Sequence, residues 1–559
     1  MTRSLAAPEL AAAAGAAERE LAEAAPHLVE GFRAALPIAV AHVGQRLRGA
    51  LHREGLRPDP DGVAHAFGRV EHADAPGDPA ELLGGLDHPG GAVLATEVTD
   101  AAVNLAVAYA RQPGIHARVR ARADVLGAAD LLDCASSLTP DEQAVFFERL
   151  ATEGHNLHPC GRTRLGWRIR DLLAHDVETL ATTVHLAAVR QDAHRGDDLG
   201  ALLRAAYPDV PEAPPGYRVQ PVHAWQLAHL TRHRPELAGR LRLLDAVPLT
   251  AAPTSALRTL LLPPDRTGTR HYLKLSLDIQ VTSTRRTISV ASTRNGPLIS
   301  ALLHEVLDDD RVLLLAEVAG AALDAGPGAD RDAAAILRDG LGDRLAPGEI
   351  AVPGAALPAR SPLTGRPVLA EIVDAYTRST GRPALSFVDE YAGLLLPPVL
   401  RLATRYGIGL EAHLQNCLPT FVAGVPHRIA FRDFAGLRLH VPRLRARGLL
   451  PELWPGSVVA TESVDVLLAK VCYTALQAHL GELVVQLVGS HGLDEAAAWR
   501  LVRARVDEAY DELRADQAIA AAARADHAFL TAPTVPHKAL VRMRLQDAGD
   551  VYVPVKNAL

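Results

Sequence analysis

The chain has 559 residues, of which 48% are hydrophobic, and it carries a formal net charge of -7. This length and apolar content are enough for several packed units or one large multi-lobed enzyme, and they exclude a small module or a globally disordered chain. The acidic balance argues against a broad nucleic-acid-binding surface, because a phosphate backbone requires a net basic face.

The cysteines and the apolar runs bear on the compartment. The four cysteines lie far apart and form no CxxC pair, which predicts free thiols in a reducing cytosol and not a zinc ribbon or a disulfide framework. The apolar run at 312–323 is short and contains Glu317, so no transmembrane helix is expected. We therefore expect a cytoplasmic protein that binds neither membrane nor nucleic acid.

Secondary-structure patterns change along the chain. Residues 1–150 are rich in alanine and leucine at helical spacing, which predicts a mainly helical region. From about Pro208 to Leu357 the chain contains more Val, Thr and Pro, with short strand-like runs. Beyond the proline-rich stretch at 352–367 the pattern is again mainly helical, with a long buried helix expected at 463–488.

The segment EGHNLHPCGRTRLGW (153–167) combines two histidines with two arginines. His155 and His158 have the H-x-x-H spacing of a metal site, but the asparagine and proline beside them favour a loop, and no third ligand lies nearby. Arg162 and Arg164 would share one face of an extended segment and could bind a phosphate or carboxylate together. An anion site is favoured here, while a metal site and a plain turn stay open.

The run LKLSLDIQVT (273–282) alternates strictly between apolar and polar residues, which predicts one half-buried strand with a polar face. That face carries Lys274 and Thr282, and Arg286 follows soon after. A solvated sheet face would explain the same pattern without a ligand. Further candidate phosphate ligands upstream are Ser255 and Arg258.

A third polar group lies in YGIGLEAHLQNCLPTF. Glu411, His413 and Gln415 alternate with apolar residues, so an extended backbone would place them on one face, with Asn416 just after. Asp433 follows in FRDFAG, in the way that ATP-dependent phosphotransferases pair an Asn and an Asp around magnesium. A structural strand followed by a hydrophilic turn is the alternative.

These segments together resemble the NRPS-independent siderophore synthetases, the aerobactin-synthetase-like IucA/IucC family. GHNLHPCGRTRLGW is similar to the family motif G-H-P-x-H-P-x-x-K-x-R-x-G-[FW], and PVHAWQ is similar to P-V-H-P-W-Q. Lys274, Thr282 and Arg286 match the K-L-S-L…T…R strand, while LEAHLQN and RDFAG match L-E-A-H-x-Q-N…R-D-x-x-G. The departures from the family pattern are Asn156 for Pro, Arg162 for Lys and Ala224 for Pro.

The resemblance implies an α+β fold shaped like a cupped hand. Its parts would be a helical thumb (1–150), fingers with an antiparallel sheet and part of the ATP site (151–360), and a mainly helical palm with the remaining ATP, magnesium and substrate residues (361–559). It also implies a homodimer. The implied reaction uses ATP and Mg²⁺ to adenylate a carboxylic acid, such as citrate, a citrate derivative, a related di- or tricarboxylate or a succinyl hydroxamate. An amine, hydroxylamine or alcohol then attacks to give an amide or ester.

Motif matching also implies a role for each site residue. ATP would be held by Ser255, Arg258, Lys274, Arg162, Arg164, Gln415 and Asn416. Catalysis is assigned to His155, His413 and Arg286. Substrate binding is assigned to Thr282, Arg286 and His158. Magnesium would be held by Glu411, Asn416 and Asp433.

Two other classes of function stay open at this point. The HLQN…RD pairing alone would suit a kinase-like phosphotransferase, although no glycine-rich loop precedes a strand lysine in the kinase manner. The many histidines would suit a non-catalytic siderophore-binding protein.

Overall fold

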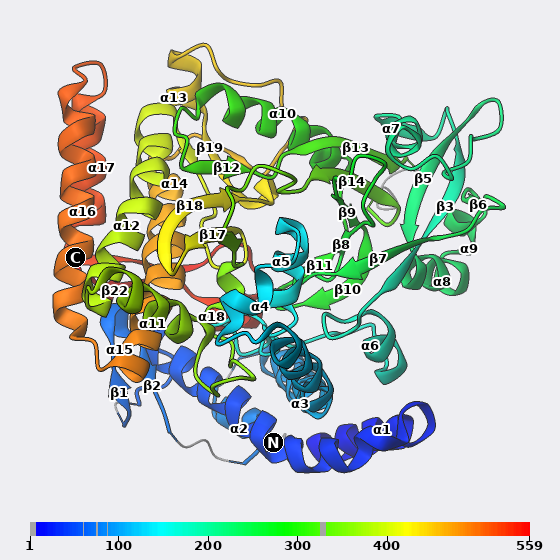
Figure 1. The fold of residues 1–559 in the computed structure, drawn as a ribbon, viewed down its shortest axis with the longest axis horizontal. Helices are drawn as coiled ribbons and strands as arrows, with labels where there is room; N and C mark the ends of the chain where they lie inside the picture. Colours follow the sequence, from blue (N-terminus) through cyan, green and yellow to red (C-terminus); the bar gives the residue numbers. More distant parts are fainter. Residues whose placement is uncertain (1–6, 60, 74–76, 87, 325–330) are drawn as a thin grey trace.

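The computed structural model of the chain describes residues 7–59, 61–73, 77–86, 88–324 and 331–559. Helices and sheets are mixed, which confirms the α+β class. In the view of Figure 1, the first helices lie along the bottom, the large sheet lies to the right, and the C-terminal helices stack on the left. The cupped-hand division into three lobes stays a prediction.

The N-terminal part packs helix against helix. Along α2 (Val29–Arg53), buried residues recur mainly three or four positions apart from Phe32 to Leu51, so one face of this helix is apolar. That face packs on α3 (Gly91–Leu126) in one core. The other elements of this part are α1 (Ala7–Ala24), η1 (Pro26–Leu28), β1 (Val63–Ala64), η2 (Ala66–Gly68), β2 (Val70–Glu71), η3 (Pro79–Leu83), α4 (Leu131–Ala135), α5 (Pro140–Glu148) and α6 (Ile169–His175).

A large antiparallel sheet occupies the middle of the chain. Among the described residues its strands pair in the order β4-β13-β14-β9-β8-β7-β3-β5, with β6 beside β3. The strands are β3 (Thr182–Arg190), β4 (His194–Gly196), β5 (Tyr217–His223), β6 (Arg242–Leu243), β7 (Leu249–Pro253), β8 (Thr259–Leu261), β9 (His271–Leu275), β13 (Glu317–Leu323) and β14 (Ala334–Asp339). The helices of this region are α7 (Leu199–Ala206), α8 (Ala224–His233), α9 (Pro235–Ala238) and α10 (Val290–Val306).

The run at 273–282 is not the single strand that its alternation predicts. β9 ends just before Ser276, and a second strand, β10 (Leu277–Val281), pairs with β11 (Thr284–Arg286) in a separate hairpin. The polar face is also not solvated at its start, because Lys274 is only 1% exposed. Alternation identifies the apolar side of a strand, but it cannot reveal a second layer of protein that covers the polar side.

Smaller sheets and a helical layer complete the fold. A four-stranded sheet has the order β12-β18-β17-β15, with β12 and β18 parallel. The strands of this part are β12 (Val312–Leu314), β15 (Glu349–Ala351), β16 (Ile408–Gly409), β17 (Cys417–Val422), β18 (Val425–Phe431), β19 (Arg438–His440), β20 (Ala460–Thr461), β21 (Thr534–Lys538) and β22 (Tyr552–Lys556). The helices are η4 (Gly354–Ala356), α11 (Val368–Thr380), α12 (Ala384–Arg401), η5 (Leu402–Tyr406), η6 (Phe434–Gly436), α13 (Val441–Ala446), α14 (Val464–Val471), η7 (Cys472–Leu480), α15 (Gly481–His491), α16 (Glu495–Ala515), α17 (Ala520–Leu530) and α18 (Leu540–Gln546).

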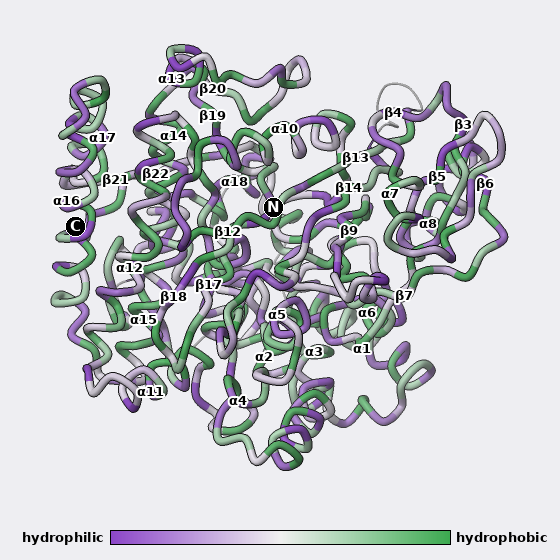
Figure 2. Tube along the Cα trace, turned by 45° about the horizontal axis from the view of Figure 1, so that its top comes forward, coloured by the Kyte–Doolittle hydropathy of each residue, from purple (hydrophilic) through white to green (hydrophobic). Residues whose placement is uncertain are grey.

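The two largest cores join distant parts of the chain. One packs residues of α2 and α3 against Trp167, Ile279 and Val541, and the other packs Phe67 and Phe147 against the C-terminal helices. Both cores therefore extend across residue 150. At the periphery, Figure 2 shows hydrophobic and hydrophilic stretches alternating along α16 and α17, as expected for helices with one buried face.

Two helical segments, Gly91–Leu126 and Val464–His491, are long and apolar enough to span a membrane by length and composition alone. Of their apolar windows, 78% and 89% are buried inside the described protein. Core helices of a globular protein show the same burial. The second segment comprises α14, η7 and α15, and it confirms the long buried helix expected at 463–488.

His479, in the π-helical η7, attaches this helix to the segment that carries Glu411 and His413. Its Nδ1 lies 3.0 Å from the carbonyl oxygen of Ala412, and its Nε2 lies 2.7 Å from the hydroxyl of Tyr391. A carbonyl only accepts, so Nδ1 donates and Nε2 accepts from the tyrosine. Burial lowers the pKa of His479 to about 4, so the ring is neutral at pH 7.

We predict that His479 makes the protein sensitive to acid. Its pKa is about 4 in the folded chain and about 6.5 in an unfolded one. Between these values the unfolded chain binds a proton that the folded chain does not, so the free energy of unfolding falls as the pH falls. Urea unfolding between pH 7 and 4.5 should give a shallower decline for His479→Gln than for the wild type. The exposed His304→Gln controls for loss of a histidine, and equal slopes for wild type and His479→Gln would contradict the prediction.

Candidate active site

Predicted site residues from four separate segments line one small cavity. The cavity volume is about 70 Å³, and the cavity adjoins a larger one of about 710 Å³. The predicted residues that line the small cavity are His155, Arg162, Arg164, Ser255, Thr282, Arg286, His413 and Gln415. The predicted residues that do not line it are His158, Arg258, Lys274, Glu411, Asn416 and Asp433. Most of them contact its walls, as described below.

The loop that carries His155 and His158 is held closed by its own backbone and by α2. Gly154 has a φ of +71°, and a Cβ at this position would lie 2.4 Å from the carbonyl oxygen of Gly161, so only glycine fits. Arg46 of α2 donates from Nη1 to the carbonyl oxygen of His155 at 3.0 Å. The segment is a loop, as the sequence predicts.

Backbone hydrogen bonds orient both histidine rings of this loop. Nδ1 of His155 accepts from the N–H groups of Leu157 (3.1 Å) and His158 (3.2 Å), and Nδ1 of His158 accepts from Cys160 (3.0 Å). Nε2 of His158 lies 2.8 Å from Ser283 Oγ. Of the four ring nitrogens, Nε2 of His155 is therefore the one left for a ligand, an arrangement that suits a reacting group better than a two-histidine metal site.

His155, His158 and His413 form a cluster of neutral imidazoles. The ring centroid of His155 lies 6.1 Å from that of His158 and 6.5 Å from that of His413. Burial, together with nearby histidine and cationic groups, lowers the pKa of His155 well below its usual value. Burial likewise lowers the pKa of His158 to about 3, and it lowers that of His413 against the opposing effect of Glu411. The rings are therefore neutral at pH 7, and those of His155 and His158, whose Nδ1 atoms accept from backbone N–H groups, carry their proton on Nε2.

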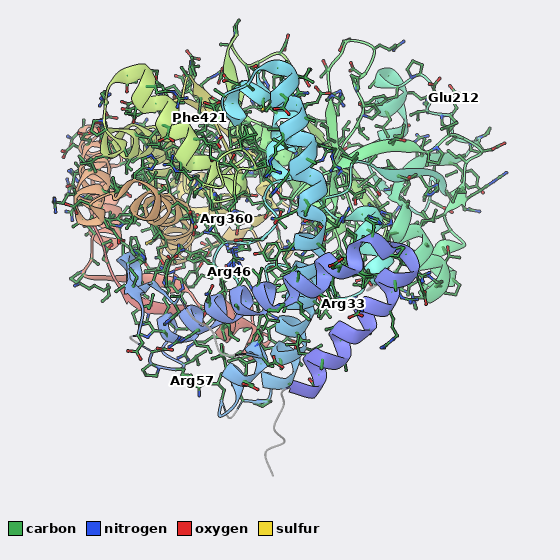
Figure 3. All side chains as sticks on the ribbon, turned by 60° about the horizontal axis from the view of Figure 1, so that its bottom comes forward. Arg33, Arg46, Arg57, Glu212, Arg360 and Phe421 are labelled. Carbon is green, nitrogen blue, oxygen red and sulfur yellow. The ribbon has the colours of Figure 1, made fainter. Side chains whose placement is uncertain are left out.

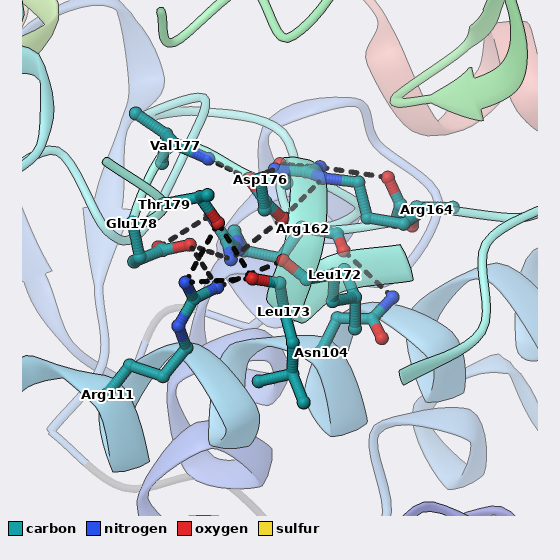
Figure 4. A network of polar contacts seen from close by, with 12 residues as sticks. Asn104, Arg111, Arg162, Arg164, Leu172, Leu173, Asp176, Val177, Glu178 and Thr179 are labelled. Carbon is teal, nitrogen blue, oxygen red and sulfur yellow. Dashed lines mark hydrogen bonds and ion pairs between the residues drawn. The ribbon is translucent and has the colours of Figure 1, made fainter. Parts of the chain in front are cut away.

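Arg162 and Arg164 are bound to acids within the protein. Their spacing in the sequence predicts that both are free to bind an anion together. Arg162 lies 3.2 Å from Asp176 and 3.1 Å from Glu178, and Arg164 Nε donates to Asp176 at 3.1 Å. Figure 4 shows both guanidiniums directed at these carboxylates, with Arg111 on the far side. Both arginines still line the cavity, but their hydrogen-bonding capacity is largely used within the protein.

Arg286 differs from this pair. Its one side-chain hydrogen bond among the described residues is from Nη2 to Thr282 Oγ1 at 3.2 Å, and no carboxylate there lies within ion-pair distance. Burial lowers its pKa to about 10, which leaves it charged at neutral pH. Thr282 holds a φ of +56°, which is strained for a β-branched residue and typical of functional sites. Among the described residues that line the cavity, one cation therefore lacks an anion.

Lys274 joins the large sheet to the loop of Asp433. Its Nζ lies 3.0 Å from Glu317 Oε1 and 2.6 Å from Asp433 Oδ1. Burial alone would raise the pKa of Asp433, but Lys274 and Arg258 outweigh it and hold that pKa well below its usual range. Asp433 has a φ of +60°, a second strained position in the predicted site. Asp433 is therefore a carboxylate at any working pH.

Glu148, at the end of α5, connects two predicted segments and has no counterpart among the predicted residues. Its carboxylate accepts from the N–H (3.0 Å) and hydroxyl (3.1 Å) of Ser255, and it also pairs with Arg432. Arg432 in turn donates from Nε to the carbonyl oxygen of Gln415 at 2.9 Å. The buried carboxylate of Glu148 thus fixes the loop that carries Ser255 relative to the 411–416 segment.

The segment 411–416 is a turn between β16 and β17 and not the expected extended strand. The expected alternation persists, with Glu411 and His413 half-buried beside fully buried apolar neighbours. Asn416 donates from Nδ2 to the carbonyl oxygen of Glu411 at 3.2 Å, which closes the turn. One turn can therefore present the same polar face that a strand would.

Glu411 lies directly against the loop of Asp433. Lys470 donates to its Oε1 at 3.1 Å, and a Cβ on Gly436 would lie 1.8 Å from its Oε2. Burial alone would raise the pKa of Glu411, but Lys470 and His413 have the larger, opposite effect, so the pKa lies below its usual value. Gly436, the last residue of RDFAG, thus makes room for the carboxylate of the other motif.

Four acids that pair with the lysine and arginines of the site were not among the predicted residues. They are Glu148, Asp176, Glu178 and Glu317. Glu317 gave a usable signal, because it interrupts an apolar run, and a charge in a buried strand needs a partner. The other three lie in unremarkable surroundings in the sequence, and nothing local identifies their partners.

Comparisons with known proteins identify the family. Residues 143–359 match the family model described as the IucA / IucC family, and residues 385–553 match the model described as ferric iron reductase FhuF-like transporter. The NRPS-independent siderophore synthetase-like protein ankE of Aspergillus thermomutatus is 30% identical over 426 residues, which cover 73% of this chain and 67% of that protein. The D-ornithine--citrate ligase of Staphylococcus aureus is 25% identical over 453 residues, which cover 73% and 68%.

The fold is shared with a solved structure. The petrobactin biosynthesis protein AsbB from Bacillus anthracis aligns over 96% of this chain and 97% of its own, with a TM-score of 0.78 and 20% sequence identity. The ordered motifs, the converging site and the relatives lead to one conclusion. The chain belongs to the IucA/IucC family of NRPS-independent siderophore synthetases, and it is a ligase.

Proposed function

We propose that this ligase adenylates a carboxylic acid with ATP and then transfers the acyl group to an amine, hydroxylamine or alcohol. The observation that carries the proposal is the charge of Arg286, which pairs with no carboxylate of the described chain and lines the same cavity as the neutral rings of His155 and His413. A buried or half-buried cation is stable only with a partner, and the carboxylate of an acid substrate would supply it in a forked hydrogen bond.

The proposed reaction has two steps. A carboxylate oxygen of the acid attacks the α-phosphorus of ATP, and pyrophosphate leaves with the electrons of the broken P–O bond. The nitrogen or oxygen of the acceptor then attacks the acyl carbon, AMP leaves, and the acceptor loses a proton. His413 would take that proton, because burial keeps its ring neutral at pH 7. His155, whose Nδ1 accepts two backbone N–H groups, carries its own proton on Nε2 and would donate a hydrogen bond to the α-phosphate or the acid. Lys274 and Arg258 would offset the charge of the phosphates.

In this proposal Arg162 and Arg164 support the site and do not bind ATP directly. Their ion pairs with Asp176 and Glu178 shape the loop and add positive potential to the cavity. Direct contact with an ATP phosphate would require those pairs to open. Ser255, although bound to Glu148, still lines the cavity and stays a candidate phosphate ligand.

Glu411, Asn416 and Asp433 fit a magnesium ion. Lys470 and Lys274 each occupy one carboxylate oxygen, of Glu411 and of Asp433 respectively, and the Asn416 contact uses its Nδ2 atom. One oxygen of each residue is thus available to a hard cation. The space beside Gly436, which a Cβ would fill, brings Glu411 close to the loop of Asp433. Magnesium bound here would neutralise phosphate charge.

The acid is proposed to be citrate, a citrate derivative, another di- or tricarboxylate, or a succinyl hydroxamate. The citrate named for the Staphylococcus aureus relative supports the first choice. We also propose that the enzyme is a cytoplasmic homodimer.

We predict that the enzyme releases pyrophosphate and AMP from ATP when magnesium and a suitable acid are present. Hydroxylamine should trap the activated acid as a hydroxamate without the natural acceptor, so a small set of acids can be screened. Release of ADP with a phosphorylated product would identify a phosphotransferase and overturn the proposal.

The second prediction concerns Arg286→Ala. The KM for the acid should rise about ten- to hundredfold, which is the usual effect of losing a hydrogen bond to a charged group, while the KM for ATP changes little. Arg285→Ala is a matched control, because the neighbouring Arg285 is 66% exposed and pairs with Asp278. An unchanged KM for the acid in Arg286→Ala would remove this residue from the substrate site.

The third prediction concerns Gly436→Ala. The new methyl group would displace the flexible end of Glu411, so the protein should fold normally. Displaced supporting groups typically weaken a metal site 10- to 100-fold, so the magnesium concentration for half-maximal pyrophosphate release should rise by about that factor. Gly489→Ala, at a helical position with open space around it, is the control. A wild-type magnesium requirement in Gly436→Ala would argue against Glu411 as a magnesium ligand.

A further inference from the structure

The larger cavity, of about 710 Å³, opens beside the small one. It is bounded by α2, α3, the His155 loop, the segment around Arg360 and part of the C-terminal region. Figure 3 shows Arg46 and Arg360, from α2 and from that segment, at this opening. The residues that line both cavities are Ala151, Gly154, Asn156, Ala355 and Pro358. A molecule in the larger cavity would therefore lie next to an acyl-adenylate in the smaller one.

Most charged groups of the larger cavity are paired within the protein. Arg46 lies 3.1 Å from Glu153, and Arg69 lies 2.7 Å from Glu482. Glu482 also accepts from Asn156 Nδ2 at 3.0 Å. These groups fix the walls of the cavity and need no ligand.

Two arginines of this cavity pair with no carboxylate among the described residues: Arg360, which is exposed to solvent, and Arg53, in the last turn of α2, which is only partly exposed. Nε of Arg53 donates to the carbonyl oxygen of Phe67 at 2.8 Å, and among the described residues no carboxylate or other acceptor pairs with its terminal nitrogens. Burial, reinforced by Arg69, lowers its pKa to about 9, so it remains charged at neutral pH. Tyr473, near enough to influence that pKa, has a buried hydroxyl with no hydrogen-bond partner. Of these two groups Arg53 lines the cavity, and Tyr473 lies behind its wall.

We propose that the larger cavity is the acceptor site, and that the acceptor is an amine that also carries a carboxylate, which Arg53 binds. This inference rests on the proposed function and specifies its second substrate. The argument is the same as for Arg286, since among the described residues each cavity has one guanidinium that is largely shielded from solvent and lacks an anion. An acceptor without a carboxylate would leave the charge of Arg53 unpaired inside the complex.

The spacing along α2 sets the length of the acceptor. Arg53 follows Arg46 by seven residues, which is about 10 Å along a helix, and Arg46 holds Glu153 at the end of the cavity beside the His155 loop. Glu153 is 42% exposed in its side chain and can accept from an ammonium group. An acceptor that reaches from Arg53 to this end needs several carbon atoms between its carboxylate and its attacking amine, as in a diamino acid.

Paired acceptors that differ only in the carboxylate test the inference. The pairs are 2,4-diaminobutyrate with 1,3-diaminopropane, ornithine with 1,4-diaminobutane, and lysine with 1,5-diaminopentane, each supplied to the wild type with ATP, magnesium and the acid found by hydroxylamine trapping. We expect a lower KM for the amino acid in at least one pair. In Arg53→Met that KM should rise about ten- to hundredfold, with no rise for the matching diamine. Arg53→Lys should recover part of the loss.

Two controls distinguish failure of the proposed function from failure of the acceptor assignment. Arg33→Met removes an arginine from the outer face of α2, where Arg33 pairs with Glu18, and it should leave both acceptors unaffected. Acid-dependent pyrophosphate release with hydroxylamine reports adenylation alone. If the wild type shows none, the proposed function and this inference both fail. If adenylation is normal but no pair shows a preference for the carboxylate, or Arg53→Met raises the KM for the acid instead, only the acceptor assignment is overturned.

Discussion

The buried ammonium group of Lys274 is the contact on which the rest of the site depends. It lies between Glu317 of the large sheet and Asp433 of the loop after β18, at 3.0 and 2.6 Å. Removing one partner of a buried ion pair costs about 3–5 kcal/mol, because the other charge is left without compensation. The sheet and the loop are therefore fixed to each other by electrostatics.

This contact also places the remaining groups. Once Asp433 is fixed, Gly436 of the same loop fixes the space for Glu411, and Glu411 lies beside His413. Glu148 performs the same function on the other side, where it holds both Ser255 and Arg432. Each motif is short, and buried acids outside the motifs determine how the motifs meet.

Arginine alone does not identify a ligand site in this protein. Arg162 and Arg164 belong to a motif that resembles the family pattern, yet both are bound to internal acids. Arg286 and Arg53 have no such partners among the described residues. The arrangement of acids around a guanidinium, more than its presence in a motif, separates a structural arginine from one that is available to a substrate.

Much of the fold class and of the site could be predicted from the sequence, because the motif residues are consecutive or nearly so. His155, Thr282, Arg286 and His413 were expected together, and all four line one cavity. The break at Ser276 and the burial of Lys274 could not be predicted, since a strand's own alternation contains no information about what covers its polar face. The partners of the cations could not be predicted either. Glu148 and Arg432 are 284 residues apart, and only the tertiary fold brings them together.

The position of Arg46 has a consequence for how this enzyme can diversify. The same side chain holds the carbonyl oxygens of Glu153 and His155, and it lines the larger cavity. A mutation there that suited a new acceptor would at the same time disturb the loop of a reacting histidine, so selection would oppose it. Arg53, two helical turns away, donates instead to the carbonyl oxygen of Phe67, which lies outside that loop. New acceptor preferences should therefore arise at the far end of α2, where variation is separated from the chemistry.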